Sequence, residues 1–139
     1  MTAEPASLDP QAMLRRSGLR PTRQRAALAD LMFGAGHRHF SAEMLHEEAT
    51  RLDVGVSLAT VYNTLHQFTR AGLLKAVSVD SARTWFDTNT SEHHHFLVEG
   101  EDIVLDVPAS SIRVSDLPDA PDGMEIERVD VIVRLRRKG

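Results

Sequence analysis

The chain has 139 residues, enough for one domain or two small ones, and it contains no cysteine. The lack of cysteine excludes disulfide bonds and thiolate metal sites. No apolar run is long enough to cross a membrane, and residues 1–5 lack the basic and apolar blocks of a signal peptide. We therefore expect a cytoplasmic protein with no membrane partner.

Charge is distributed unevenly along the chain. The formal net charge of −4 argues against nucleic-acid binding only when it is averaged over all residues. Residues 1–83 hold ten Lys and Arg against eight Asp and Glu, whereas residues 84–139 hold six against twelve. Five arginines from Arg15 to Arg25 have no acidic residue among them, a local patch of the kind that binds polyanions. The charge change near Arg83 predicts two domains, 1–83 and 84–139.

Four helices are predicted in the first half of the chain, where apolar residues recur every three or four positions. Each begins with a side chain that can cap free backbone amides, namely Asp9, Thr22, Ser41 and Ser57. Glycines mark three of the ends. The predicted ranges are 9–18, 22–34, 41–52 and 57–72. The buried stripe of the fourth helix is expected to be Leu58, Val61, Leu65 and Phe68.

After Gly72 the apolar period changes to two, which is typical of strands. Residues 74–79 and 84–88 flank a polar turn and are predicted to form a β-hairpin. Further strands are predicted at 93–99, at 103–107 and in a long segment that ends the chain. Residues 108–123 contain three prolines and are expected to be a connector with at most a short helix at 110–116. The apolar residues of the last predicted strand are Val129, Val131, Val133 and Leu135.

Several helices followed by a hairpin is the order of elements in a winged helix-turn-helix, whose last helix enters the major groove of DNA. The fourth predicted helix leaves small, hydroxyl, amide and aromatic side chains outside, and such groups contact base edges and phosphates. A plain amphipathic helix, the alternative, usually carries Glu and Lys on its solvated face, and this face has neither. The outer face consists of Ser57, Ala59, Thr60, Tyr62, Asn63, His66 and Gln67.

Three consecutive histidines, residues 93–95, follow Asp87 by six positions and precede Asp106 by eleven. Side chains alternate between the two faces of a strand, so His93 and His95 are expected on one face and His94 on the other. Two imidazoles on one face, with carboxylates nearby, suit a divalent metal that prefers nitrogen and oxygen ligands. A solvated polar turn or an expression tag is the plainer interpretation, although the internal position and the patterned flanks disfavour a tag.

Three segments resemble the ferric uptake regulator family of metal-responsive repressors. They are 19–25 (Leu-Arg-Pro-Thr-Arg-Gln-Arg), 39–43 (His-Phe-Ser-Ala-Glu) and 57–65 (Ser-Leu-Ala-Thr-Val-Tyr-Asn-Thr-Leu). With the histidine segment, the resemblance covers roughly residues 12–107 and is specific as a combination. Within the family, the chain is most similar to the iron response regulators (Irr) of alphaproteobacteria, through residues 93–96, 99–101 and 129–136.

The resemblance implies an α+β fold, with an N-terminal winged helix-turn-helix followed by a small α/β dimerisation domain. It also implies a homodimeric transcription regulator, mainly a repressor, of iron and haem homeostasis genes that binds A-T-rich inverted repeats. Such a protein is not an enzyme and has no catalytic residue. The expected contacts with double-stranded DNA are Arg20, Arg23, Ser57, Thr60, Tyr62 and Asn63.

The resemblance further implies one divalent metal ion (Zn, Mn or Fe) per protomer, held between the two domains. A histidine from the DNA-binding half takes part, so that metal binding can fix the relative orientation of the domains. His37 is a neighbouring alternative, whereas His46 and His66 have ordinary helical explanations. The implied ligands are His39, Asp87, His93, His95 and Asp106.

This chain departs from the family pattern at two places. The four-cysteine zinc site of many members cannot exist here. At a second family site, His94 stands where a carboxylate is expected and Arg113 where an acid is expected. Irr-type proteins are associated with haem sensing, and without cysteine any haem must be bound by histidine. We expect His93, His94 and His95 to bind haem as a regulatory ligand.

Two other classes of protein agree less well with the sequence. A histidine/carboxylate metalloenzyme needs an open coordination position and a placed acid or base. The sequence has no His-Glu-x-x-His helix and, beside the histidines, only Glu92 as a spare carboxylate. A metal or haem carrier without DNA binding would leave the arginine-rich helices and the outer face of the fourth helix unexplained.

Overall fold

The computed structural model describes residues 9–78, 83–91, 93–101 and 103–139. The chain divides into two compact units, residues 1–90 and 91–139. Among the described residues, no helix combines the length and the apolar character that a membrane-spanning segment needs.

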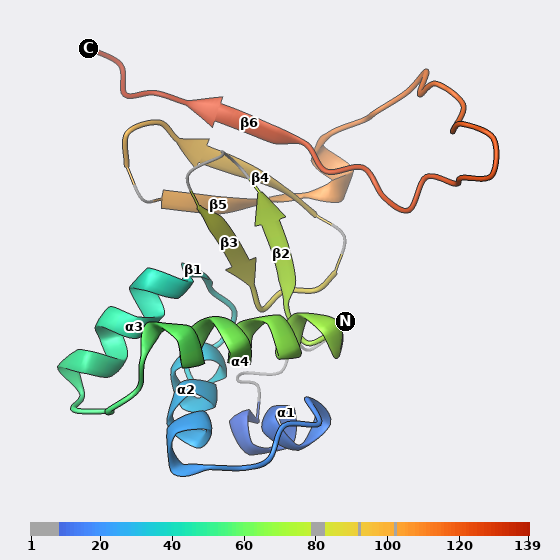
Figure 1. Ribbon diagram of the computed structural model, residues 1–139. Coiled ribbons are helices and arrows are strands. Elements are labelled where there is room, and N and C mark those ends of the chain that lie inside the picture. The colour runs from blue at the N-terminus through green and yellow to red at the C-terminus, as the bar shows by residue number, and fades with distance from the viewer. Residues whose placement is uncertain (1–8, 79–82, 92, 102) are drawn as a thin grey trace, which may run out of the picture. The chain divides into compact units, whose positions relative to one another are not determined.

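The first unit contains four helices, α1 (Pro10–Arg16), α2 (Arg23–Phe33), α3 (Ala42–Arg51) and α4 (Leu58–Arg70) (Figure 1). The four predicted caps are confirmed, since each capping side chain accepts a hydrogen bond from a backbone amide of the first turn. Past the ends of α1 and α4, Gly18 and Gly72 both adopt a φ of 78°, which other residues rarely reach. Local capping chemistry therefore sets most of the helix boundaries.

Aromatic pairs form the centre of the first unit. Phe33 of α2 stacks on Phe68 of α4 with ring centroids 5.7 Å apart, and both side chains are fully buried. The predicted stripe of α4 is wrong at Leu58, which is 37% exposed because it lies in the first turn, before the helix reaches the core. Thr64 joins the buried face instead. Its hydroxyl donates to the carbonyl of Thr60 at 2.8 Å, which satisfies the buried polar group.

A small antiparallel sheet completes the first unit. Its strands are β1 (His39–Ser41), β2 (Lys75–Ser78) and β3 (Thr84–Asp87), in the order β1-β3-β2. The predicted hairpin corresponds to β2 and β3, and part of its turn, 79–82, lies outside the described residues. The pairing of β3 with β1 ties it to the helical unit. For this reason the first unit continues to residue 90, beyond the charge change near Arg83.

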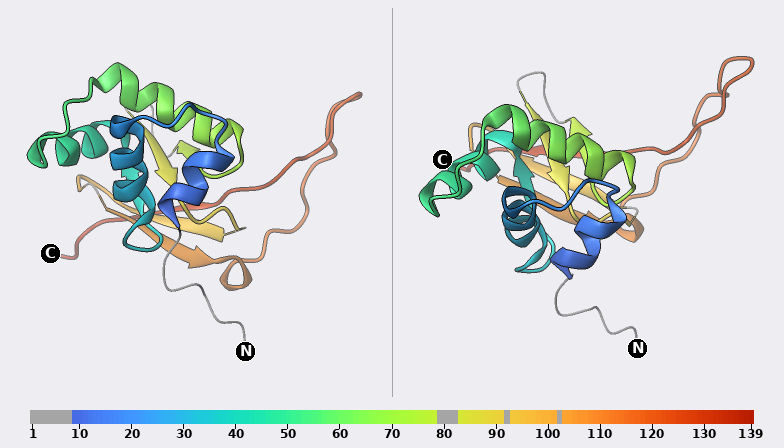
Figure 2. Two further views of the ribbon diagram at one scale, coloured as in Figure 1. Left: turned by 90° about the horizontal axis from the view of Figure 1, so that it is seen from below. Right: turned by 60° about the horizontal axis from the view of Figure 1, so that its bottom comes forward.

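The second unit is a mixed sheet of β4 (His93–Val98), β5 (Ile103–Pro108) and β6 (Ile132–Leu135), in the order β5-β4-β6. β5 runs antiparallel to β4, and β6 runs parallel to it. A parallel neighbour needs a long crossover. This crossover comprises a single 3₁₀ turn, η1 (Ala109–Ser111), and an irregular excursion over residues 112–131, drawn in orange to red in Figure 2.

One prediction for the second unit needs correction, and one agrees with the structure. The predicted long final strand is limited to β6, because residues before Val131 have left the edge of β4. The segment 108–123 is a connector with at most a short helix, as predicted, since its helical part is the single turn η1. Pro118 and Pro121 lack the amide donors that a continuing helix needs, so the segment stays irregular.

Candidate metal and DNA-binding sites

Two of the predicted metal ligands lie together at one end of the first sheet. His39 begins β1 and pairs in register with Asp87, the last residue of β3. Nε2 of His39 lies 3.0 Å from Oδ2 of the buried Asp87 carboxylate. The backbone amide of Asn89 donates to Oδ1 of Asp87 at 2.8 Å and orients the carboxylate. This pair offers one nitrogen and one oxygen ligand.

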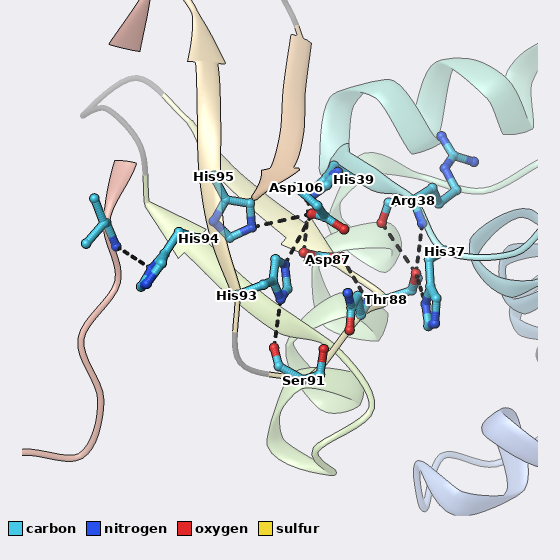
Figure 3. A network of polar contacts seen from close by, with 12 residues as sticks. His37, Arg38, His39, Asp87, Thr88, Ser91, His93, His94, His95 and Asp106 are labelled. Carbon is cyan, nitrogen blue, oxygen red and sulfur yellow. Dashed lines mark hydrogen bonds and ion pairs between the residues drawn. The ribbon is translucent and has the colours of Figure 1, made fainter. Parts of the chain in front are cut away.

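Thr88 connects this pair to the segment before β1 (Figure 3). Its hydroxyl accepts from the backbone amide of Arg38 at 2.9 Å, and its own amide donates to the carbonyl of Arg38 at 3.2 Å. Nδ1 of His37, the alternative ligand, lies 3.3 Å from the same hydroxyl oxygen. His37 therefore contacts Thr88, while His39 contacts the carboxylate of Asp87.

The other three predicted ligands come together in the second unit (Figure 3). His95 of β4 pairs in register with Asp106 of β5. Nε2 of His93 lies 3.2 Å from Oδ1 of Asp106, and Nε2 of His95 lies 4.0 Å from the same oxygen. Both imidazoles thus turn the same ring nitrogen towards one carboxylate, as the alternation of a strand predicts.

The donor set of the second unit suits a metal cation. Nδ1 of His93 lies 2.7 Å from the carbonyl oxygen of Ser91, which can only accept, so Nδ1 carries a proton. In the neutral ring, Nε2 then presents its lone pair to the carboxylate of Asp106. A cation would stabilise this lone pair beside the carboxylate, and a backbone carbonyl behind the distal nitrogen is a common way to orient a ligating imidazole.

His94 points away from His93 and His95, to the opposite face of the sheet (Figure 3). Its Nδ1 accepts a hydrogen bond from the backbone amide of Val131 at 3.1 Å, and it is only 8% exposed. The three predicted haem ligands therefore do not converge on one point, and His94 is not open to the solvent. The strand register places apolar residues on the same face, namely Phe96, Val98, Val107, Val131, Val133 and Leu135.

The predicted DNA-binding residues lie in two places in the first unit. Arg20 and Arg23 lie just before α2 and at its start, and the others lie on α4 and at its N-cap. Arg20, Arg23 and Asn63 are exposed. The Ser57 hydroxyl accepts from the amide of Thr60 at 3.1 Å and donates to the Thr60 hydroxyl oxygen at 2.9 Å. Both of these side chains therefore already form the cap of α4.

The structure adds Glu43 of α3 to this surface, a residue that the sequence did not single out. Tyr62 is half-buried, and its hydroxyl donates to Oε2 of Glu43 on α3 at 2.5 Å. This hydrogen bond lowers the pKa of Glu43 and raises the pKa of Tyr62. The two residues are 19 positions apart, so only the packing of α3 against α4 reveals the pair.

Comparison with known proteins identifies a family model and several relatives that match this chain. A model of the ferric uptake regulator family matches residues 16–132. The chain is 34% identical to the ferric uptake regulation protein of Bordetella parapertussis over 88 residues, which is 63% of each protein. It is 32% identical over 104 residues to the peroxide-responsive repressor PerR of Staphylococcus epidermidis, covering 71% of this chain and 69% of that protein. The match thus spans less than two thirds of the Bordetella protein's length.

A solved structure of the ferric uptake regulator of Pseudomonas aeruginosa with manganese has the same fold. It aligns with a TM-score of 0.68 and 24% sequence identity, over 95% of this chain and 100% of that chain. The expected α+β architecture, with N-terminal helices, a small wing and a C-terminal mixed sheet, is confirmed. Because the family model matches most of its length, the chain belongs to the ferric uptake regulator family, whose members are transcription regulators and not enzymes.

Proposed function

We propose that this protein is a metal-responsive transcription regulator that binds operator DNA as a homodimer in the cytoplasm. The observation that carries the proposal is that histidine and carboxylate side chains able to bind a metal pair up in both units. They are His39 and Asp87 in the first unit and His93, His95 and Asp106 in the second. A mobility-shift assay with genomic fragments, with and without a chelator, tests it. Binding that needs a divalent metal is expected, whereas a metal or haem carrier would shift no DNA.

We propose that the two ligand sets close on one divalent ion per protomer. Only five residues separate Asp87 from His93 in the sequence. When bound, the ion would supply the positive charge that both carboxylates attract, and it would crosslink the DNA-binding unit to the second unit. Nitrogen and oxygen ligands accept Zn, Mn and Fe(II), so the metal available in the cell decides which one is bound.

We propose that the outer face of α4 reads the operator. Arg20, with Arg23 nearby, would reach the minor groove or the DNA backbone. Tyr62 would make an apolar contact with a thymine methyl group, and Thr60 and Asn63 would contact bases or phosphates. A-T-rich inverted repeats are the expected targets, because their narrow minor grooves attract arginine and a symmetric dimer matches a palindrome. Repression of iron and haem homeostasis genes, the role of Irr-type regulators, is the finer form of this proposal.

Replacing Tyr62 by alanine is expected to weaken operator binding by about 1–3 kcal/mol and to relax sequence preference, since a base contact is lost. Arg20→Ala should weaken binding to all sequences more evenly and reduce its salt dependence, because a phosphate contact is lost. Titrations against matched and scrambled operators at two salt concentrations separate the two effects. If Tyr62→Ala keeps both affinity and preference, α4 is not the reading helix.

We propose that the apolar face of the second sheet closes the homodimer. Leu105 is 48% exposed, and a hollow of about 330 Å³ beside it is lined by Val98, Ile103, Leu105, Leu135, Arg136 and Arg137. Burying such a face against a second copy removes apolar surface from water and covers a sheet edge. The resulting twofold pair would match an inverted-repeat operator.

Truncation after Asp122 removes β6, the parallel neighbour of β4, and is expected to abolish the dimer. Leu105→Glu places a charge on the same face without removing a strand, and it should also give a monomer. Light scattering at micromolar concentration measures both. A wild-type monomer under these conditions, or a dimeric Leu105→Glu variant with an unchanged dissociation constant, would contradict this interface.

Haem is the signal that we propose for release of DNA, on the basis of the three consecutive histidines and of the resemblance to Irr-type regulators. Haem bound by His93 or His95 would remove a metal ligand, and haem bound by His94 would first break its hydrogen bond with Val131. Either change should lower operator affinity, and a coupling of about 1–3 kcal/mol is typical. Hemin titration of the wild type and of a His93/His94/His95→Ala variant measures the Soret band and the release of DNA. If both are unchanged in the variant, hemin adsorbs nonspecifically.

A further inference from the structure

Two side chains of the first unit hold Tyr62 from different sides. Glu43 of α3 accepts the hydrogen bond of its hydroxyl at 2.5 Å. One turn further along α4, the ring of His66 stacks on the Tyr62 ring, with centroids 6.1 Å apart and planes inclined by 21°. The rings of His66 and of Phe86 on β3 in turn form a T-shaped contact, with centroids 6.2 Å apart. The orientation of the Tyr62 ring is thus determined before any DNA arrives.

We propose that Glu43 is a positioning residue that makes Tyr62 recognise thymine through its ring and not through its hydroxyl. The inference rests on the proposed DNA-binding role of α4. A phenol has a single proton to donate, and a hydrogen bond to a carboxylate is stronger than one to a neutral base. Because the hydroxyl already donates its hydrogen bond to Glu43, the part of Tyr62 that remains for a base is its apolar ring. In the major groove, the thymine C5-methyl group is the apolar partner.

Glu43 should also have a second effect on DNA binding. Its negative charge should lower the affinity for all DNA, whereas its positioning of Tyr62 should raise the preference for thymine, and the two effects can be measured separately. Glu43 is exposed and belongs to the same surface as Tyr62, so its charge repels phosphates. If charge were its only role, Glu43→Ala would bind every DNA more tightly and discriminate between sequences as before. If Glu43 positions Tyr62, the same substitution reduces discrimination, whatever happens to the overall affinity.

The experiment uses DNA that the wild-type protein selects from a random library, and the same duplex with uracil in place of each thymine in turn. At the position that Tyr62 reads, the wild type should lose about fourfold in affinity for uracil, as expected for one buried methyl group. Glu43→Ala should reduce this ratio to nearly one, whereas Glu43→Gln keeps an oxygen acceptor and should preserve it. Glu47→Ala removes the same charge from the same helix, where Glu47 pairs only with Arg51 among the contacts observed, and should leave the ratio unchanged.

A second measurement needs no DNA. Tyr62 is the only tyrosine and Trp85 the only tryptophan, so tyrosinate absorbance follows Tyr62 alone, and Trp85 fluorescence shows whether the chain stays folded. The hydrogen bond to Glu43 raises the pKa of Tyr62, and Glu43→Ala should lower it towards that of a free phenol. The proposal is overturned if the two proteins ionise alike, or if Glu43→Ala retains the full thymine preference. If the wild type selects no DNA at all, the proposed function fails, and the titration still tests the hydrogen bond.

Discussion

Alanine at Asp87 or at His93 is expected to lower metal occupancy and operator affinity together. Each change removes one proposed ligand, Asp87 from the first unit and His93 from the second. Loss of an outer-shell partner alone typically costs about 10–100-fold in metal affinity, so loss of a ligand should cost more than about 100-fold. Elemental analysis of the purified variants, paired with operator titrations at fixed free metal, measures both quantities.

The matched control for these variants is His37→Ala. It removes an imidazole two residues from His39, but its ring contacts Thr88 and not the carboxylate of Asp87. Its metal occupancy should stay near that of the wild type. Protons compete with the metal for imidazole, so metal affinity should also fall as the pH is lowered. If metal-free protein binds its operator at full strength, the metal does not control DNA binding, although the metal site itself could still exist.

Phe68→Ala is expected to lower the free energy of unfolding of the first unit by about 3–5 kcal/mol. Phe68 is fully buried and stacks on Phe33, so truncation leaves a cavity between α2 and α4. Because Phe68 and Tyr62 share α4, loosening this packing should also weaken DNA binding. Urea denaturation followed by the fluorescence of Trp85 measures the loss.

Leu58→Ala provides the comparison on the same helix. Leu58 is 37% exposed in the first turn of α4, and its truncation should change stability by no more than about 0.5 kcal/mol. If Leu58→Ala destabilises the unit as much as Phe68→Ala does, the buried face of α4 differs from the one described.

Elements governed by local chemistry could be predicted from the sequence. The four helices begin at the expected caps because a hydroxyl or carboxylate must satisfy free amides within its own turn. β1 was not predicted, because its three residues are too few to show a period and form a strand only by pairing with β3. The final strand was predicted too long, because alternation in the sequence does not show where the partner strand ends.

The candidate sites show the same division. His93 and His95 could be placed on one face because alternation along a strand is a local property. His39 entered only through the family resemblance, since its place beside Asp87 results from the β1–β3 pairing. The carbonyl of Ser91, the amide of Asn89 and the Glu43–Tyr62 pair have no sequence signal, because each depends on how the folded backbone directs a side chain.

The central position of β4 limits which changes in chain length the second unit can tolerate. One face of this strand carries His93 and His95, and the other carries His94, Phe96 and Val98, which we propose for dimer contacts. A single-residue deletion within 93–98 would exchange the two faces downstream of it, turning imidazoles towards the apolar side and apolar groups towards Asp106. Removing two residues would preserve the alternation. Length variants of related chains should therefore differ by even numbers within β4, whereas the irregular segment before Val131, which is bonded to β4, should tolerate changes of any length.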